Sequence, residues 1–87
     1  MRHEDIPIGE PVAMVYTNYR GEHARRTVLP ERVWFGATEW HPAPQWLLDA
    51  YDFDREALRS FALEDVEAIE RVGNDVLDGR TAQRTPA

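Results

Sequence analysis

The sequence predicts a mostly β domain, in which about five short antiparallel strands form a meander that closes into a small barrel, followed by one acidic helix. Short runs of β-branched and aromatic residues alternate with turn signals along most of the chain. After position 64 the apolar residues instead recur every third or fourth position. The length of 87 residues suits one compact domain.

The expected domain boundaries follow from composition. Residues 1–11 hold two prolines and a glycine without periodicity, so we expect an N-terminal tail that lies along the domain. Residues 12–77 form the single barrel domain with its helix. Residues 78–87 are polar and small, and we expect a disordered tail there.

The first half of the domain reads as three strands, at residues 12–19, 24–29 and 32–35. Gly21 supplies the first turn, because glycine tolerates a positive φ. Pro30 cannot donate to a ladder and therefore marks a bend or an edge. A three-residue turn would place the apolar residues of the first two strands on one face, with the pairs Val12–Pro30, Met14–Val28 and Tyr16–Arg26.

A proline-stiffened loop over residues 37–45 precedes a second hairpin. That hairpin joins strands at 45–51 and 57–63 around a four-residue loop at 53–56. Its expected pairs are Trp46–Leu63, Leu48–Phe61 and Ala50–Arg59. We expect Trp46 in the core with the large apolar members of this set.

The last segment is expected to be helical. Val66, Ile69, Val72 and Val76 fit a helical stripe, and Gly73-Asn74 is a typical helix end. Six acids and one base make residues 64–78 strongly acidic. The apolar stripe covers one end of the barrel or, alternatively, forms the seam of a homodimer.

Charge and composition limit the functional classes. A net charge of −6 argues against unspecific nucleic-acid binding, although residues 19–33 are locally basic. The chain has no cysteine, which excludes disulfides and cysteine-ligated zinc. It shows no export signal or membrane-spanning run, so we expect a cytoplasmic protein. Neither His3-Glu4-Asp5 nor Glu39 with His41 has the spacing of a known metal site, and we expect no metal or cofactor.

Four runs in order carry a family resemblance. They are Tyr16-Thr17-Asn18-Tyr19-Arg20-Gly21-Glu22, Arg26-Thr27-Val28-Leu29-Pro30, Trp46-Leu47-Leu48-Asp49-Ala50-Tyr51 and Arg59-Ser60-Phe61-Ala62-Leu63. They resemble the WYL domain, whose pattern is a Tyr and a turn, Arg-x-x-x-Pro, a Trp-Tyr-Leu strand and Arg-x-Phe-x-Leu. The chain departs from it at Leu47, in place of the namesake tyrosine, and at Ala62 and Asp65, where many members carry arginine.

The resemblance implies an Sm-like five-stranded barrel. In that family the barrel usually follows a helix-turn-helix in bacterial transcription regulators and senses ligands, often nucleotides or nucleic acids, through a basic and aromatic pocket. With only eleven residues before the first strand, we expect a small stand-alone member. The resemblance makes Arg26 and Arg59 the pocket cations and gives Trp46 a core role.

The candidate ligand-binding residues are Arg25, Arg26, Trp40, His41 and Arg59. Paired guanidinium groups hold phosphate or carboxylate, but Arg26 and Arg59 can equally pair with Asp49, Asp52 or Glu31 on the surface of the sheet. Trp40 and His41 form either a recognition tip, since aromatic side chains stack on bases, or a cap that folds back on the barrel mouth.

No arrangement of residues supports catalysis. Ser60, the only serine, faces Asp49 in the expected register, and such a pair without a histidine is typical of a structural hydrogen bond. We therefore expect a non-catalytic binding module for an anionic ligand, either a nucleotide or single-stranded nucleic acid. The alternative is a protein-interaction or assembly domain that uses a barrel edge or the acidic helix.

Overall fold

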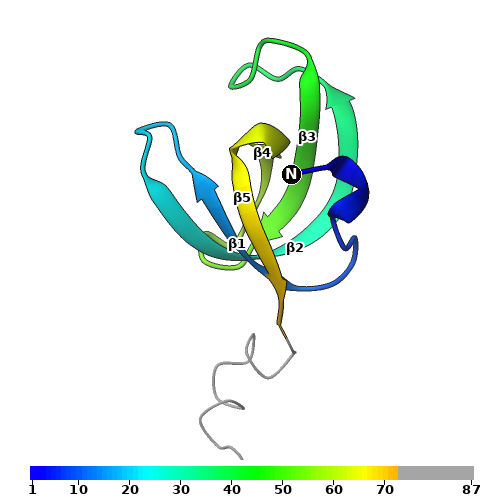
Figure 1. Cartoon of the computed structure of the whole chain (residues 1–87), viewed down its shortest axis with the longest axis vertical. Coiled ribbons are helices and arrows are strands. Elements are labelled where there is room, and N and C mark those ends of the chain that lie inside the picture. Colours follow the sequence, from blue (N-terminus) through cyan, green and yellow to red (C-terminus); the bar gives the residue numbers. More distant parts are fainter. Residues whose placement is uncertain (73–87) are drawn as a thin grey trace, which may run out of the picture.

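The computed structural model describes residues 1–72 as one curved antiparallel sheet of five strands (Figure 1). The strands are β1 (Val12–Thr17), β2 (His23–Gly36), β3 (Gln45–Asp52), β4 (Ala57–Ala62) and β5 (Val66–Arg71). Two short 3-10 turns, η1 (His3–Asp5) and η2 (Leu63–Asp65), are the only helical segments within the described residues. The mostly β prediction is therefore confirmed.

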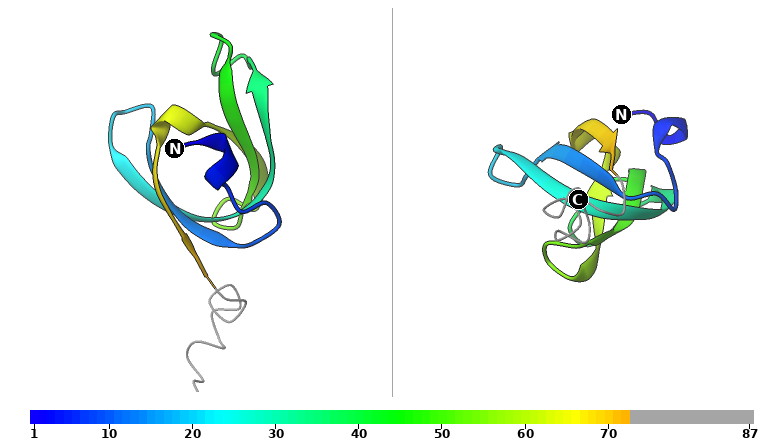
Figure 2. Two further views of the ribbon diagram at one scale, coloured as in Figure 1. Left: turned by 45° about the vertical axis from the view of Figure 1, so that its right-hand side comes forward. Right: turned by 90° about the horizontal axis from the view of Figure 1, so that it is seen from below.

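The sheet is not closed into a barrel, which corrects the predicted architecture. Its strand order is β4-β3-β2-β1-β5, with β4 and β5 as the two edges. The sheet curls strongly around the core, as two further views show (Figure 2). Within residues 1–72 no ladder joins β4 to β5, so both strands keep one free edge.

The strand β2 joins two of the predicted strands into one. It continues through Pro30, and the register with β3 shifts between Pro30 and Arg32. Pro30 thus marks a bend within a continuous strand. The bulge beside it interrupts the ladder where proline has no N–H to donate. Gly21 has a φ of 78° in the β1–β2 turn, as expected.

The predicted acidic helix is wrong for the residues that the structure describes. Residues 66–71 form the edge strand β5, paired with β1. Tyr16 faces Val66 and Met14 faces Ile69, so three steps on β5 match two on β1. This bulge brings Val66 and Ile69 to the same face of a strand, with the spacing that a helix would also give. Positions 73–77 of the expected helix and the expected tail at 78–87 lie outside the described residues.

The register predictions have mixed outcomes. The pairs Leu48–Phe61 and Ala50–Arg59 are confirmed. The β1–β2 register is offset by two residues, with Val12 opposite Val28, because the turn between the strands spans five residues instead of three. An offset of two preserves which side chains share a face.

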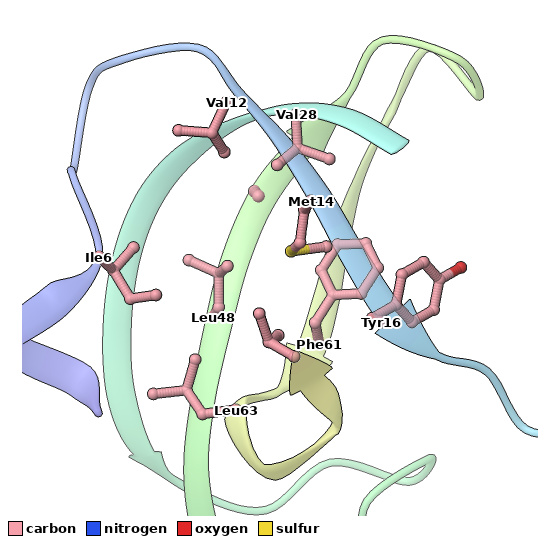
Figure 3. Close-up of a cluster of buried hydrophobic side chains, with 10 residues drawn as sticks. Ile6, Val12, Met14, Tyr16, Val28, Leu48, Phe61 and Leu63 are labelled. Atoms are coloured by element: carbon pink, nitrogen blue, oxygen red, sulfur yellow. The ribbon is translucent and has the colours of Figure 1, made fainter. Parts of the chain in front are cut away.

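The core lies on the concave face of the sheet (Figure 3). Its buried apolar members come from all five strands, η2 and the N-terminal segment: Ile6, Val12, Met14, Tyr16, Val28, Leu48, Ala50, Phe61, Leu63 and Val66. Ile6 is only 6% exposed, so the predicted N-terminal tail contributes a side chain to the core. Burial of this side chain helps to offset the entropy cost of ordering the segment.

Trp46 is not in the buried cluster, which corrects another prediction. It is 40% exposed and stacks on His3, with ring centroids 4.0 Å apart. Trp46 lies at the end of the concave face, where it pairs with the exposed Phe35 of β2. The paired part of β4 ends at Ala62, so no residue of β4 lies opposite the tryptophan. Among residues 1–72, no helix has the length and apolar character needed to cross a membrane.

Candidate anion-binding groove

One groove of about 800 Å³ lies beside the core, and its lining reaches from the β1–β2 and β3–β4 turns to the β2–β3 loop. Its walls come from five parts of the chain: β1 and its turn, β2 with the loop that follows, the β3–β4 turn, β4, and η2. The lining residues are Tyr16, Thr17, Asn18, Tyr19, Arg26, Thr38, Trp40, His41, Arg55, Leu58, Arg59, Ser60, Phe61, Ala62 and Asp65. Four of the five predicted site residues therefore line a single groove.

Strand alternation explains why two arginines reach this groove. Arg26 pairs with Met14, and Arg59 pairs with Ala50, so both side chains leave their strands on the core face. The side chain of Arg26 is 26% exposed and that of Arg59 is 31% exposed. Each arginine lies at the border where the buried cluster ends and the groove begins.

Both arginines face Asp52, which is fully buried. Its Oδ2 accepts a hydrogen bond from Arg59 Nη1 at 3.0 Å and lies 3.9 Å from Arg26 Nε. Its Oδ1 accepts from the backbone N–H groups of Asp54 and Arg55, at 2.9 and 3.2 Å. The carboxylate thus connects Arg26 and Arg59, which form the floor of the groove, to the β3–β4 turn.

The alternative prediction, that Arg26 and Arg59 pair with an acid, is confirmed in part. Asp52 is the acid, but it lies inside the fold, not on the surface of the sheet. Asp52 follows Leu48 and Ala50 at alternate positions of β3, and this period of two is the sequence signal that places it inward.

Arg59 is held as a cation by its neighbours. Burial lowers the pKa of Arg59, but side-chain hydrogen bonding to Tyr16 and Asp52 and the negative charge of Asp52 outweigh burial and raise that pKa above its usual value. Its guanidinium carbon also lies 4.8 Å from the centroid of the Phe61 ring. Phe61 in turn packs edge-on against Tyr16, with ring centroids 5.1 Å apart.

Arg26 has one buried hydrogen-bond donor without an acceptor among the described residues. Its Nη1 donates to the backbone carbonyl of Arg25 at 2.9 Å. Its Nε is buried and has no hydrogen-bond acceptor among residues 1–72. An unsatisfied buried donor is unfavourable, and the carboxylate oxygen Oδ2 of Asp52 lies 3.9 Å away.

The β2–β3 loop forms the far wall of the groove. Thr38 Oγ1 accepts from the backbone N–H groups of Trp40 and His41, at 3.2 and 3.0 Å, which fixes the tip of the loop. Trp40 is nevertheless 80% exposed. Its side chain therefore does not cap the core, and the recognition-tip interpretation fits the geometry better.

Arg25 does not join this group. It pairs with Val15 and alternates with Arg26, so its side chain leaves the opposite face of β2 and does not line the groove. Composition alone made Arg25 a candidate, because it belongs to the same basic stretch. The groove residues that sequence reasoning missed include Tyr16, Tyr19, Arg55 and Phe61, which only the curvature of the sheet brings together.

A second polar cluster lies on the convex face. Asp49 Oδ1 accepts from Ser60 Oγ at 2.6 Å, and its Oδ2 accepts from Arg32 Nε at 2.8 Å. Burial raises the pKa of Asp49, but the hydrogen bonds from Ser60 and Arg32 outweigh burial and lower it overall. The expected structural pair of Ser60 and Asp49 is present.

The comparisons with known proteins give one match. Neither a curated protein nor a solved structure matches the chain. The profile of the WYL domain matches residues 6–71, which is well over half of the sequence and includes every strand of the sheet. The chain belongs to the WYL domain family.

Proposed function

We propose that this domain is a non-catalytic binding module that senses an anionic ligand, either a nucleotide or a short single-stranded nucleic acid, in the groove described above. Membership of the WYL domain family supports a regulatory ligand-sensing role in general. The observation that carries the proposal is the convergence of Arg26, Arg59 and Trp40 on one groove from three separate elements.

The chemistry of the groove fits such a ligand. Guanidinium groups bind phosphate oxygens through paired N–H donors. Exposed aromatic side chains stack on bases, each contributing about 1–3 kcal/mol. Both kinds of group lie within the same groove, and the cationic floor belongs to an otherwise acidic chain of net charge −6. The repulsion from the rest of the surface would favour ligands that reach the floor over unspecific binding.

The decisive experiment compares adjacent arginines on opposite faces of β2. Arg26→Gln removes a groove cation that makes no hydrogen bond to Asp52, so its effect on stability is expected to be small. Arg25→Gln removes the same charge from the same strand but from the other face. Binding of a fluorescent single-stranded oligonucleotide and of adenosine 5′-monophosphate (AMP) is measured for wild type and both variants.

We expect Arg26→Gln to weaken binding at least tenfold, which corresponds to about 1.4 kcal/mol. For the oligonucleotide, the slope of log affinity against log salt concentration should fall by about one, as for the loss of one phosphate contact. Arg25→Gln should leave affinity within about twofold, since screened exposed charges contribute little. Equal losses in both variants, or negligible binding by the wild type, would reject the groove as an anion site.

A second candidate function is protein interaction or assembly through an edge of the sheet. The observation that favours it is β5, an edge strand in which Glu67 and Glu70 are exposed. An unpaired strand edge can add a strand from another chain, and its acidic side chains suit a basic partner. The predicted homodimer is the version with a second copy as partner.

Light scattering tests this alternative independently of any ligand. A concentration-dependent dimer would support assembly through β4 or β5. A monomer at all accessible concentrations, together with no binding of a basic peptide, would leave the edge without a partner and favour the sensing function.

A further inference from the structure

We propose that Asp52 is a specificity-determining residue: its buried carboxylate cancels one of the two guanidinium charges on the groove floor, so the groove prefers a singly charged phosphodiester to a doubly charged terminal phosphate. This inference rests on the proposed function, because it concerns the same groove. It goes beyond that function by naming which phosphate group binds.

The carboxylate of Asp52 is a fixed charge. It has no exposed surface, and each of its oxygens already accepts at least one hydrogen bond. Rotation of the side chain would break the contacts to the turn and to Arg59 together. A ligand therefore meets Arg26 and Arg59 as a group of net charge +1, not +2.

A single positive charge favours a singly charged ligand. The attraction between an anion and the floor grows in proportion to the charge of the anion. The cost of removing the anion from water grows with the square of that charge, on the Born description of solvation. A terminal phosphate carries about −1.5 to −2 at neutral pH, so its desolvation cost rises more steeply than its attraction to a floor of net charge +1.

The remaining lining charges do not change this balance. Arg55 and Asp65 are the other formally charged residues that line the groove, and their charges are opposite. The net charge of the floor therefore depends on Asp52 and its two arginines.

The aromatic residues of the groove point to the same kind of ligand. Tyr19, on the β1–β2 turn, is 90% exposed, and Trp40, on the β2–β3 loop, is 80% exposed. Both line the groove, from separate loops. A phosphodiester within a strand has a base on each side, so a strand across the floor would offer one base to each loop. A free nucleotide has only one base to offer.

Three ligands that differ by one feature at a time test the proposal. They are AMP, its phosphate methyl ester, which carries one charge less, and a dinucleoside monophosphate of two adenosines, which adds a second base. Affinities are measured by Trp fluorescence at pH 8 and constant ionic strength. We expect the methyl ester to bind at least as tightly as AMP and the dinucleoside monophosphate to bind about tenfold more tightly than the ester.

Two variants locate the selectivity in Asp52. Asp52→Asn raises the floor to two positive charges and should shift the ratio of affinities about tenfold toward AMP over its ester. Asp49→Asn is the matched control, because that carboxylate pairs with Arg32 on the convex face, and it should leave the ratio unchanged.

The outcomes separate this inference from the proposed function. If the wild type binds AMP at least tenfold more tightly than the methyl ester, or if folded Asp52→Asn keeps the wild-type ratio, the inference is wrong although the groove still binds anions. If none of the three ligands binds, both proposals fail. Should Asp52→Asn not fold, the wild-type comparison of AMP with its ester still tests the preference for the singly charged ligand, and tighter binding of AMP by tenfold would overturn the inference.

Discussion

Replacing Asp52 by alanine should be among the most destabilising changes on the polar side of the groove. The substitution leaves two backbone N–H groups of the β3–β4 turn without their acceptor. It also leaves Arg59 without its partner at 3.0 Å and Arg26 without the nearest negative charge. Each of these groups is wholly or partly shielded from water.

The expected size of the effect follows from those contacts. A neutral hydrogen bond contributes about 1 kcal/mol and a charge-assisted one about 2 kcal/mol. Breaking a fully buried ion pair costs about 3–5 kcal/mol, but both arginines are partly exposed and water replaces part of the lost contact. We therefore expect Asp52→Ala to lower the free energy of unfolding by about 3 kcal/mol.

Urea unfolding followed by Trp fluorescence measures this loss. With an m-value of about 1 kcal/mol/M for a domain of this size, the midpoint should fall by about 3 M, or the variant should be unfolded without urea. Asp54→Ala is the control, because Asp54 is exposed and, within residues 1–72, its side chain accepts one backbone hydrogen bond, from Thr27, at 3.2 Å. A loss for Asp52→Ala no larger than that for Asp54→Ala would refute the anchoring role.

Three further predictions concern the core, the loop and pH. Met14→Ala should lower the free energy of unfolding by about 2–5 kcal/mol in urea titrations, because Met14 is fully buried. Trp40→Ala should change stability by less than about 0.5 kcal/mol, whereas Trp46→Ala, which loses the stack on His3, should cost more in the same assay. The pKa of Asp49 is lower in the folded than in the unfolded chain, so its contribution to stability is complete above the unfolded value and is lost as pH falls through the folded value. Thermal melts below about pH 4 should therefore show a shallower loss of stability for Asp49→Asn than for wild type, and parallel curves would contradict this.

Local patterns were enough to predict most of the sheet. The hairpin of β3 and β4 is correct in register, because a four-residue loop and alternating apolar residues such as Leu48 and Phe61 allow only one pairing that buries them. The β1–β2 hairpin is correct in face but offset in register. Its turn begins at Asn18, whose Oδ1 accepts from the N–H groups of Arg20 and Glu22, and this side-chain contact lengthens the loop.

Two features depend on long-range pairing that the sequence does not display. The bulge opposite Tyr16 gives β5 an apolar spacing of three, which periodicity cannot distinguish from one face of a helix. Closure of a barrel depends on whether β4 and β5 meet, and neither strand carries a pattern that reports this. Both errors come from non-local contacts, and neither disturbs the strands that carry Arg26 and Arg59.

The candidate groove was partly predictable for the same reason. Arg26 and Arg59 follow from the resemblance and from their positions on inward strand faces. The sequence offered Asp52 as one of three possible partner acids on the surface of the sheet. Its choice over Asp49 and Glu31 required the structure, because the buried acid pairs diagonally across β3 and β4 and reaches Arg26 on a third strand. Tyr19 joins the groove only through the curl of the sheet.

The central claim is that Arg26, Arg59 and Trp40 form one anion-binding surface. An NMR titration of the labelled domain with a short single-stranded oligonucleotide tests it most directly, by following the arginine Nε–H and tryptophan indole signals. We predict shifts for those three side chains together, with those of Arg25 and Trp46 unchanged. Shifts confined to β5 or to Trp46, with Arg26 and Arg59 unaffected, would contradict the claim.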